Sequence, residues 1–162
     1  ISKLKEDFKV KILYNQKLSP KMQKTIQKLK LENKIEFVYD ITSEEFYKSI
    51  DCIVMPSLNE PFGLAALEIM AKGKIVLISS RCGIKDIIEH DNNGFIFDIT
   101  QNPVRNLYKT MKYILSTKND FENTQQKAIY TASVYNSDKL KDELLRIINS
   151  NFDTKASEEC TS

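Results

Sequence analysis

The sequence has 162 residues, of which 41% are hydrophobic and 28% charged, and its formal net charge is +2. These values are ordinary for a globular protein, and the length suits one domain with its own core. No apolar run approaches the roughly 18 residues that a membrane-spanning helix needs, and the N-terminus lacks a signal-peptide pattern. We therefore expect a cytoplasmic protein.

Cysteine and histidine are too few for the common metal and disulfide frameworks. Cys52, Cys82 and Cys160 are widely spaced and form no CxxC pair, and His90 is the single histidine. This pattern argues against both a zinc site and a set of disulfides. We expect no metal and no cofactor.

Hydrophobic residues alternate between a strand period and a helix period along the chain. The pattern predicts strands over 8–14, 35–39, 51–56, 74–79 and 94–98. It predicts helices over 19–33, from Thr42, over 63–72 and 84–90, and then over 103–116, 119–133 and 137–149. Ser19 before Pro20 is a helix start, and TSEE from Thr42 has the spacing of a capping box.

Strand and helix alternate five times before the helical end of the chain. This order is typical of an α/β fold with a doubly wound parallel sheet, Rossmann-like, with helices on both faces. We expect one domain over residues 1–150 and a mobile polar tail over 151–162.

The N-terminal quarter is basic, with ten lysines against four acidic residues in positions 1–36. Lys17, Lys21, Lys24 and Lys28 recur at helical spacing, so they could face phosphates or an anionic membrane, or form a solvated helix face. No nucleic-acid recognition motif accompanies the charge, and we expect no nucleic-acid partner. Peripheral contact with a membrane stays open.

The stretch EPFGLAALEIM, residues 60–70, holds two carboxylates in an otherwise apolar segment. A buried carboxylate without a partner is costly, so Glu60 and Glu68 are candidates for binding. Two alternatives remain open. Glu68 could be a surface residue paired with Lys72 four positions on, and Glu60 could interact only with the positive end of the helix that follows.

The segment that holds Glu60 follows the third predicted strand, where open parallel sheets bind ligands. The helix that begins near Phe62 would direct its N–H groups and its dipole at an anion such as phosphate. Along a helix, eight residues rise by about 12 Å, whereas the two carboxylates of a glycosidase lie about 5–9.5 Å apart. The spacing therefore favours one extended ligand with hydroxyls at both ends and phosphates between, as in a sugar nucleotide.

The stretch NEPFGLAALEIMAKGKIVLISSRCGIKDIIEHDNNGFIFD resembles the C-terminal, donor-binding domain of the GT-B retaining glycosyltransferases of group 1, family 4. Glu60 and Glu68 match the E-x7-E motif of that family. The segments AKGK, CGIKDII and NNGFIF follow in the family's order, so the resemblance covers residues 35–98 and extends to the strand and helix before them.

The resemblance implies roles for individual residues. Glu60 would contact hydroxyls of the transferred sugar and serve as the catalytic-site carboxylate, and Glu68 would bind the ribose hydroxyls. The turn would meet the sugar and the phosphates through backbone groups, and the loop after the second strand would lie near the nucleobase. These further substrate-binding residues are Pro61, Phe62, Gly63 and Leu64 in the turn, and Tyr39 and Ile41 in the loop.

The resemblance also implies a retaining, metal-independent transfer of a sugar from a nucleoside-diphosphate donor to a saccharide or lipid-linked acceptor, in polysaccharide or glycolipid synthesis. The N-terminal acceptor domain would lie outside this sequence, and the fragment alone would be inactive. Two alternatives stay open at this point. One is a non-catalytic nucleotide- or phosphate-binding α/β module, and the other is half of a sugar-nucleotide epimerase.

Overall fold

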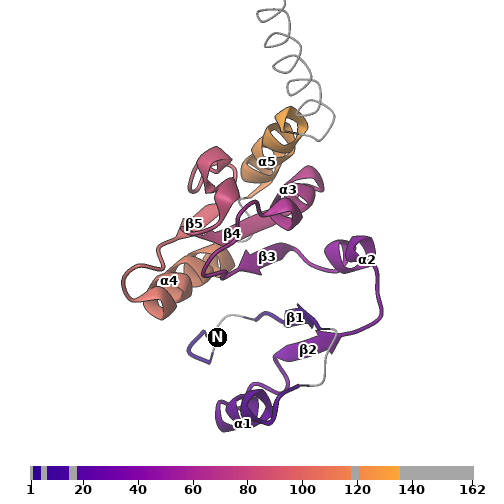
Figure 1. Ribbon diagram of the computed structural model, residues 1–162, viewed down its shortest axis with the longest axis vertical. Helices are drawn as coiled ribbons and strands as arrows, with labels where there is room; N and C mark the ends of the chain where they lie inside the picture. Colours follow the sequence, from indigo (N-terminus) through magenta and orange to yellow (C-terminus); the bar gives the residue numbers. More distant parts are fainter. Residues whose placement is uncertain (1, 5–6, 15–17, 118–120, 136–162) are drawn as a thin grey trace, which may run out of the picture.

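The computed structural model describes residues 2–4, 7–14, 18–117 and 121–135 (Figure 1). Strands and helices alternate along this part of the chain. In order, the elements are β1 (Val10–Leu13), α1 (Pro20–Lys28), β2 (Ile35–Val38), α2 (Ser43–Lys48), β3 (Cys52–Met55), α3 (Leu64–Ala71), β4 (Ile75–Ser79), the 3₁₀ helix η1 (Gly83–Ile87), β5 (Phe95–Phe97), α4 (Pro103–Ser116) and α5 (Glu122–Val134).

The helix starts predicted from local residue chemistry are confirmed. The Ser19 hydroxyl accepts a hydrogen bond from the Met22 N–H, and Pro20 occupies the first helical position. Thr42 and Glu45 form the predicted capping box at the start of α2, because each side chain accepts a hydrogen bond from the backbone N–H of the other. Such caps satisfy N–H groups that have no partner inside the helix.

All five strands lie within their predicted ranges, as do α1, α3 and α4. α2 begins directly after Thr42, and α5 extends one residue beyond its predicted range. One element differs: the segment expected to form an α-helix over 84–90 forms the shorter 3₁₀ helix η1. The helix predicted over 137–149 and the tail over 151–162 lie outside the described residues.

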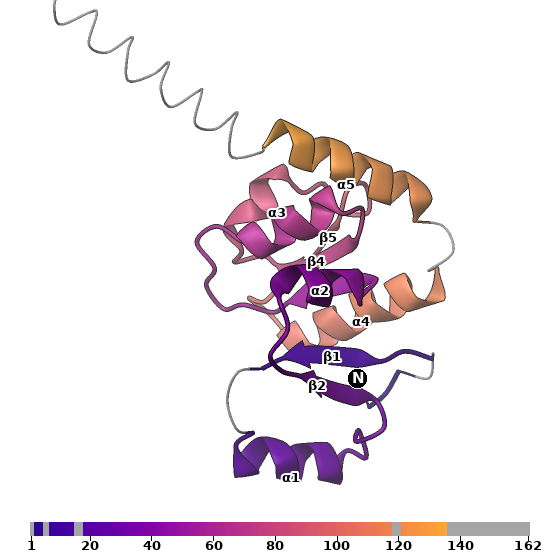
Figure 2. The same ribbon diagram turned by 90° about the vertical axis from the view of Figure 1, so that its right-hand side faces the viewer.

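The strands are parallel, but they form two sheets (Figure 2). β1 pairs with β2, and β3, β4 and β5 form a three-stranded sheet with β4 in the centre. The α/β, Rossmann-like fold class is thus confirmed. Within the described residues the parallel strands fall into two sheets, because β1 and β3 are not hydrogen-bonded to each other.

The core lies on both faces of β4, which is fully buried. Val76 and Ile78 point into a cluster formed with α3 and α5, while Ile75 and Leu77 point into a second cluster formed with β5 and α4. This alternation is the period of two that a strand imposes, and a strand covered on both faces reads as a continuous apolar run. The half around β4 is therefore well packed.

The half that contains β1, α1 and β2 has much less core. Among the described residues before α2, the buried ones are Leu4 and Leu31. The helix α1 buries none of its residues. The two halves of the molecule therefore differ sharply in how completely they are packed.

Candidate functional site

Two loops meet at the carboxyl edge of the three-stranded sheet. The first connects β3 to α3 over residues 56–63, and the second connects β4 to η1 over residues 80–82. Because β3 and β4 are parallel neighbours, their carboxyl ends lie at the same edge. This is the edge at which open α/β sheets bind ligands.

Three hydrogen bonds fasten the first loop to the second and to the end of β4. The Glu60 N–H donates to the Arg81 carbonyl (3.2 Å), and the Gly83 N–H donates to the Glu60 carbonyl (2.7 Å). The buried Ser79 hydroxyl donates to the Ser57 carbonyl (2.6 Å). The backbone at Glu60 is therefore held by protein contacts from both sides.

Glycine is required where the loops touch. A Cβ atom at Gly83 would lie 1.8 Å from the Pro61 carbonyl oxygen, which no real contact permits. Gly63 has φ of +84° and, with a Cβ, would meet Cys82 Sγ at 2.7 Å and an Ile84 methyl at 2.9 Å. A side chain at either position would separate the loops or distort the start of α3.

The Glu60 carboxylate lies at the N-terminus of α3. Its Oε1 accepts a hydrogen bond from the Gly63 N–H at 3.2 Å. Gly63 is the N-cap of α3 and has no side chain with which to cap the helix. The N-terminal interaction considered for Glu60 is thus present, and it shows that an anionic group is accommodated at this helix end.

Glu68 lies on the exposed side of α3, whereas Ala66, Ile69 and Met70 of the same helix are fully buried. The expectation of a carboxylate surrounded by apolar side chains was therefore wrong, because helical geometry separates residue 68 from its buried neighbours. The alternative of a surface position is confirmed. Among the described side chains, however, Glu68 forms no ion pair with Lys72.

Tyr47 of α2 is the notable neighbour of Glu68. Burial raises the pKa of the Tyr47 phenol, and a hydrogen bond with the Glu68 carboxylate and its negative charge raise that pKa further. The buried Tyr47 side chain is thus a hydrogen-bond partner of the Glu68 carboxylate, which is otherwise exposed. α2 and α3 present these two groups side by side.

The remaining predicted site residues fall into two groups. Pro61, Phe62 and Leu64 surround the start of α3 and are exposed, Phe62 by 75% and Leu64 by 66%. Tyr39 and Ile41 follow β2: Tyr39 is exposed, and Ile41 packs against the same hydrophobic cluster as α3. The structure brings the first group together with Glu60.

Three residues that set this geometry escaped the sequence analysis as site residues. Ser79 holds the first loop, Gly83 permits the loop contact, and Tyr47 binds Glu68. The lone glycine after Cys82 was the available signal for the loop contact. No sequence pattern indicates that Ser79 or Tyr47 would reach these partners.

His90, Cys52 and Cys82 are the other side chains that could take part in chemistry, and each has a structural role or environment instead. The His90 Nδ1 accepts a hydrogen bond from the Ile96 N–H at 3.0 Å, and its ring packs edge-on against Phe95. Cys82 is buried, and burial raises the pKa of the Cys52 thiol to about 12. A thiol with so high a pKa is a poor nucleophile at neutral pH.

The profile of the family described as "Glycosyl transferases group 1" matches residues 1–134. The chain belongs to the group 1 glycosyl transferases. This membership favours a transferase over the epimerase and the non-catalytic module considered above.

The chain is similar to several longer glycosyltransferases and related proteins. It is 48% identical over 67 residues to an uncharacterized glycosyltransferase of Methanocaldococcus jannaschii, which covers 41% of the chain and 17% of that relative. A crystallised glycosyltransferase of Rickettsia africae superposes with a TM-score of 0.75 and 25% identity, covering 90% of this chain and 41% of that one. Anabaena HepE, solved with UDP and glucose, superposes with a TM-score of 0.70 and 22% identity, covering 80% and 36%.

The group 1 chain thus spans well under two thirds of the proteins it matches. Its parallel α/β arrangement corresponds to the C-terminal half of the GT-B fold. No helix in the described part of the chain is long and apolar enough to cross a bilayer.

The loop contact predicts that Gly83→Ala lowers the free energy of unfolding by about 1–3 kcal/mol or more, because the Pro61 backbone must move to admit a methyl group. Lys85→Ala, at an exposed position of η1, should change it by less than about 0.5 kcal/mol. Urea denaturation measures both variants. Equal stability of the two would mean that the loops do not touch.

The contact between α2 and α3 predicts that Glu68→Gln lowers the pKa of Tyr47, because a carboxylate that raises it is removed. Burial remains, so the pKa should stay above the ordinary tyrosine value. Since the folded-state pKa exceeds the unfolded one, stability falls as pH rises past about 10, the ordinary tyrosine pKa, and the loss should be smaller in the variant. NMR titration of labelled tyrosine measures the shift, with Glu44→Gln as the control. An unchanged pKa in Glu68→Gln would contradict the contact.

Proposed function

We propose that this domain binds the nucleoside-diphosphate sugar of a retaining, family 4-type GT-B glycosyltransferase, with the diphosphate at the N-terminus of α3. The observation that carries the proposal is the Glu60 carboxylate on the Gly63 N–H, 3.2 Å apart. An anionic oxygen already uses this helix end. The intrahelical hydrogen bonds of α3 begin at the Ala66 N–H, which donates to the Gly63 carbonyl, so the N–H groups of Leu64 and Ala65 precede the first helical acceptor. Phosphate oxygens suit the same donors.

Glu68 supplies the contact for the ribose. It lies on the exposed side of α3, one turn beyond the start of the helix, where a ligand that begins at the helix end can extend along α2 and α3. A carboxylate accepts hydrogen bonds from two vicinal hydroxyls at once. The Tyr47 phenol orients the carboxylate by donating to it, which leaves further lone pairs for the ribose.

Glu60 and the loop around it supply the sugar end of the site. The backbone of Glu60 is fixed by Arg81 and Gly83, so its side chain is anchored at the meeting point of both loops. When the donor enters, the Glu60 carboxylate exchanges its bond to Gly63 for hydroxyls of the transferred sugar, and the phosphate takes its place. Pro61, Phe62 and Leu64 line the turn beside it. Tyr39 and Ile41 are the proposed neighbours of the nucleobase.

The chemistry that this arrangement assists is departure of the diphosphate. Negative charge grows on the leaving phosphate oxygens as the glycosidic bond breaks, and preorganised N–H donors stabilise that charge. We propose a metal-independent reaction, since the sequence contains no DxD triplet. The acceptor hydroxyl would attack the same face of the sugar, giving retention at the anomeric carbon.

The rest of the enzyme is proposed to cover this edge of the sheet. Leu58, Phe62 and Leu64 are apolar and 66–82% exposed around the start of α3. Such a group of exposed apolar side chains favours a surface that is covered in the intact protein. We propose that an N-terminal domain brings the saccharide or lipid-linked acceptor to this edge and that the fragment alone transfers nothing. A cytoplasmic enzyme in polysaccharide or glycolipid synthesis, with peripheral membrane contact, fits this role.

The ribose contact predicts that Glu68→Ala weakens binding of UDP or GDP by about 10–100-fold, the cost of losing hydrogen bonds to a charged group. Isothermal titration with each nucleotide measures the effect. Alanine suits an exposed helix position, so the fold should be retained.

The matched control is Glu44→Ala, which removes an exposed carboxylate from the neighbouring helix α2, where it pairs with Lys48. This variant should bind as the unaltered protein does. Equal affinities for Glu68→Ala and Glu44→Ala would remove the ribose assignment.

A further inference from the structure

The 3₁₀ helix η1 connects the candidate site to the opposite edge of the sheet. Its first residue is Gly83, whose N–H donates to the Glu60 carbonyl at 2.7 Å. Its second residue, Ile84, is buried, and one of its methyl groups would lie 2.9 Å from a Cβ atom at Gly63. The start of η1 therefore touches both the Glu60 loop and the N-cap of α3.

The other end of η1 is held by the side chain of Asn93, which lies in the turn before β5 and is 6% exposed. Asn93 Nδ2 donates to the carbonyl of Ile87, the last residue of η1, at 3.0 Å. The same Nδ2 donates to Thr131 Oγ1 of α5 at 2.9 Å. Asn93 Oδ1 accepts from the Glu89 N–H at 2.8 Å. One buried side chain thus joins η1, the turn before β5 and α5.

The partners of Asn93 allow one orientation of its amide group. A backbone carbonyl can only accept and a backbone N–H can only donate, so Nδ2 faces Ile87 and Oδ1 faces Glu89. The second N–H of the amide is used as well, because it reaches Thr131. An aspartate has the same shape, but it would direct an oxygen at the Ile87 carbonyl and leave that buried acceptor without a donor.

The helix α5 holds Thr131 in place. The Thr131 hydroxyl donates to the Lys127 carbonyl one turn earlier, so its oxygen is directed to accept from Asn93. Ala128 and Ala132 of α5 are buried in the cluster that also contains residues of α3 and η1. α5 packs along α3 (Figure 2). The three helices therefore lie on the same face of the sheet.

The turn that carries Asn93 rests directly on β4. A Cβ atom at Gly94 would lie 2.8 Å from a Val76 methyl group of β4 and 3.1 Å from an Ile88 methyl group. The Asp91 N–H donates to the Gly94 carbonyl at 2.8 Å and closes the turn. Asn93 therefore binds η1 from a well-packed part of the molecule.

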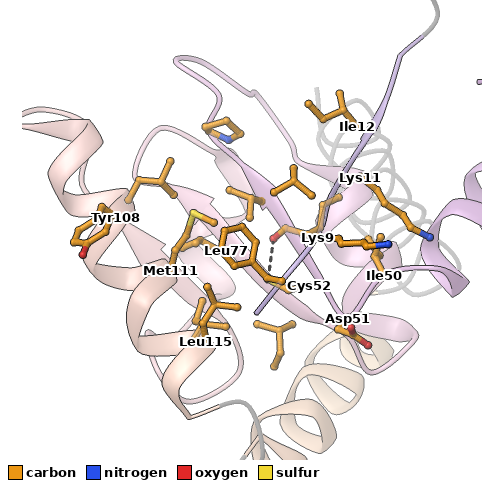
Figure 3. A pocket seen from close by; sticks show the side chains of 18 of the residues that line it. Lys9, Lys11, Ile12, Ile50, Asp51, Cys52, Leu77, Tyr108, Met111 and Leu115 are labelled. Atoms are coloured by element: carbon orange, nitrogen blue, oxygen red, sulfur yellow. Dashed lines mark hydrogen bonds between the residues drawn. The ribbon is translucent and has the colours of Figure 1, made fainter. Parts of the chain in front are cut away.

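The opposite face of β4 takes no part in this network. There Leu77 lines a cavity together with Met111 and Leu115 of α4 (Figure 3). Met111 packs against the core cluster on that face, whereas Asn93 and its partners do not line the cavity. Met111 thus supports the sheet without touching η1.

We propose that Asn93 is a positioning residue for the Glu60 loop. By holding the end of η1 to α5, it fixes Gly83 and so the turn into α3. η1 has five residues, and backbone hydrogen bonds from Lys85 to Cys82 and from Ile88 to Lys85 close its turns. So short a helix moves as one piece, so a displacement at its end displaces its start.

The position of the Glu60 loop has a consequence for the donor. The N-terminus of α3 begins at the end of this loop, and its N–H groups keep a fixed direction only while the loop is held. Asn93 therefore supports binding of the diphosphate without touching it. This consequence rests on the proposed function, whereas the positioning of the loop does not.

Hydrogen exchange in the full-length protein, followed by NMR without nucleotide, tests the positioning. Asn93→Asp retains the shape of the side chain and removes both donors. Exchange at the Gly83 and Glu60 amides should then accelerate on the order of 10-fold more than exchange at Val76 and Leu77 of β4.

Two control variants separate positioning from other effects. Asn92→Asp makes the same substitution at the neighbouring position, where the side chain bonds to the Glu89 and Lys127 side chains, and should leave Gly83 unchanged. Met111→Ala weakens packing on the other face of β4, and it should not accelerate exchange at Gly83 more than in β4 itself.

A second variant covers the case in which Asn93→Asp does not fold. Thr131→Val has nearly the same shape as the natural residue and removes one acceptor of the Asn93 amide while leaving the bond to Ile87. It should accelerate exchange at Gly83 in the same direction by a smaller factor. No change at Gly83 in this variant would count against the proposal.

Two results with Asn93→Asp would overturn the proposal. Faster exchange confined to Glu89 and Asp91, with Gly83 unchanged, would show that Asn93 holds only its own turn. Equal acceleration at Gly83 and in β4 would show a general loss of stability.

Calorimetric titration with UDP tests the consequence for the donor. Asn93→Asp should bind UDP on the order of 10-fold more weakly than Asn92→Asp does. Equal affinities of the two variants would overturn the role of Asn93 toward the donor. Absence of UDP binding by the unaltered protein would overturn the proposed function, and the exchange experiment would still decide whether Asn93 positions the loop.

Discussion

The pair of backbone hydrogen bonds that joins Glu60 to the loop after β4 is the constraint on which the site depends. Glu60 donates to Arg81 and accepts from Gly83, and the second bond is short because residue 83 has no side chain. This contact sets where the chain turns into α3, and so where the helix N-terminus points. An anion site made of backbone N–H groups has no other means of adjustment, since its donors cannot rotate as side chains do.

The sheet supplies the rigidity behind this contact. β4 is buried on both faces, and the loop after it carries Arg81 and Gly83, while the Ser79 hydroxyl at its end reaches Ser57. The site is thus built on the best-packed strand of the molecule. The poorly packed half around β1 and β2 holds only the loop with Tyr39 and Ile41. This division suits the proposed donor site, because its phosphate end lies on the well-packed half.

Local chemistry was readable from the sequence, but neighbours in space were not. The strands, the Ser19 cap and the Thr42 capping box follow from short-range patterns and were predicted correctly. The position of the Glu60 loop at a strand end followed from the same reasoning. The environment of Glu68 was not predicted correctly, because apolar residues next to it in the sequence lie on other faces of the helix. Contacts such as Tyr47 with Glu68 join separate elements, and no periodicity encodes them. The split into two sheets likewise depends on which strands meet.

The central claim is that the N-terminus of α3 binds the diphosphate of a sugar nucleotide. Backbone amide shifts during titration of the full-length protein with UDP and GDP test it most directly. We expect the largest changes at Gly63, Leu64 and Ala65. The start of α1 is the rival site, because it is also a helix N-terminus and carries lysines such as Lys21 and Lys24. Changes concentrated at Met22 and Gln23, with residues 63–65 unaffected, would contradict the account.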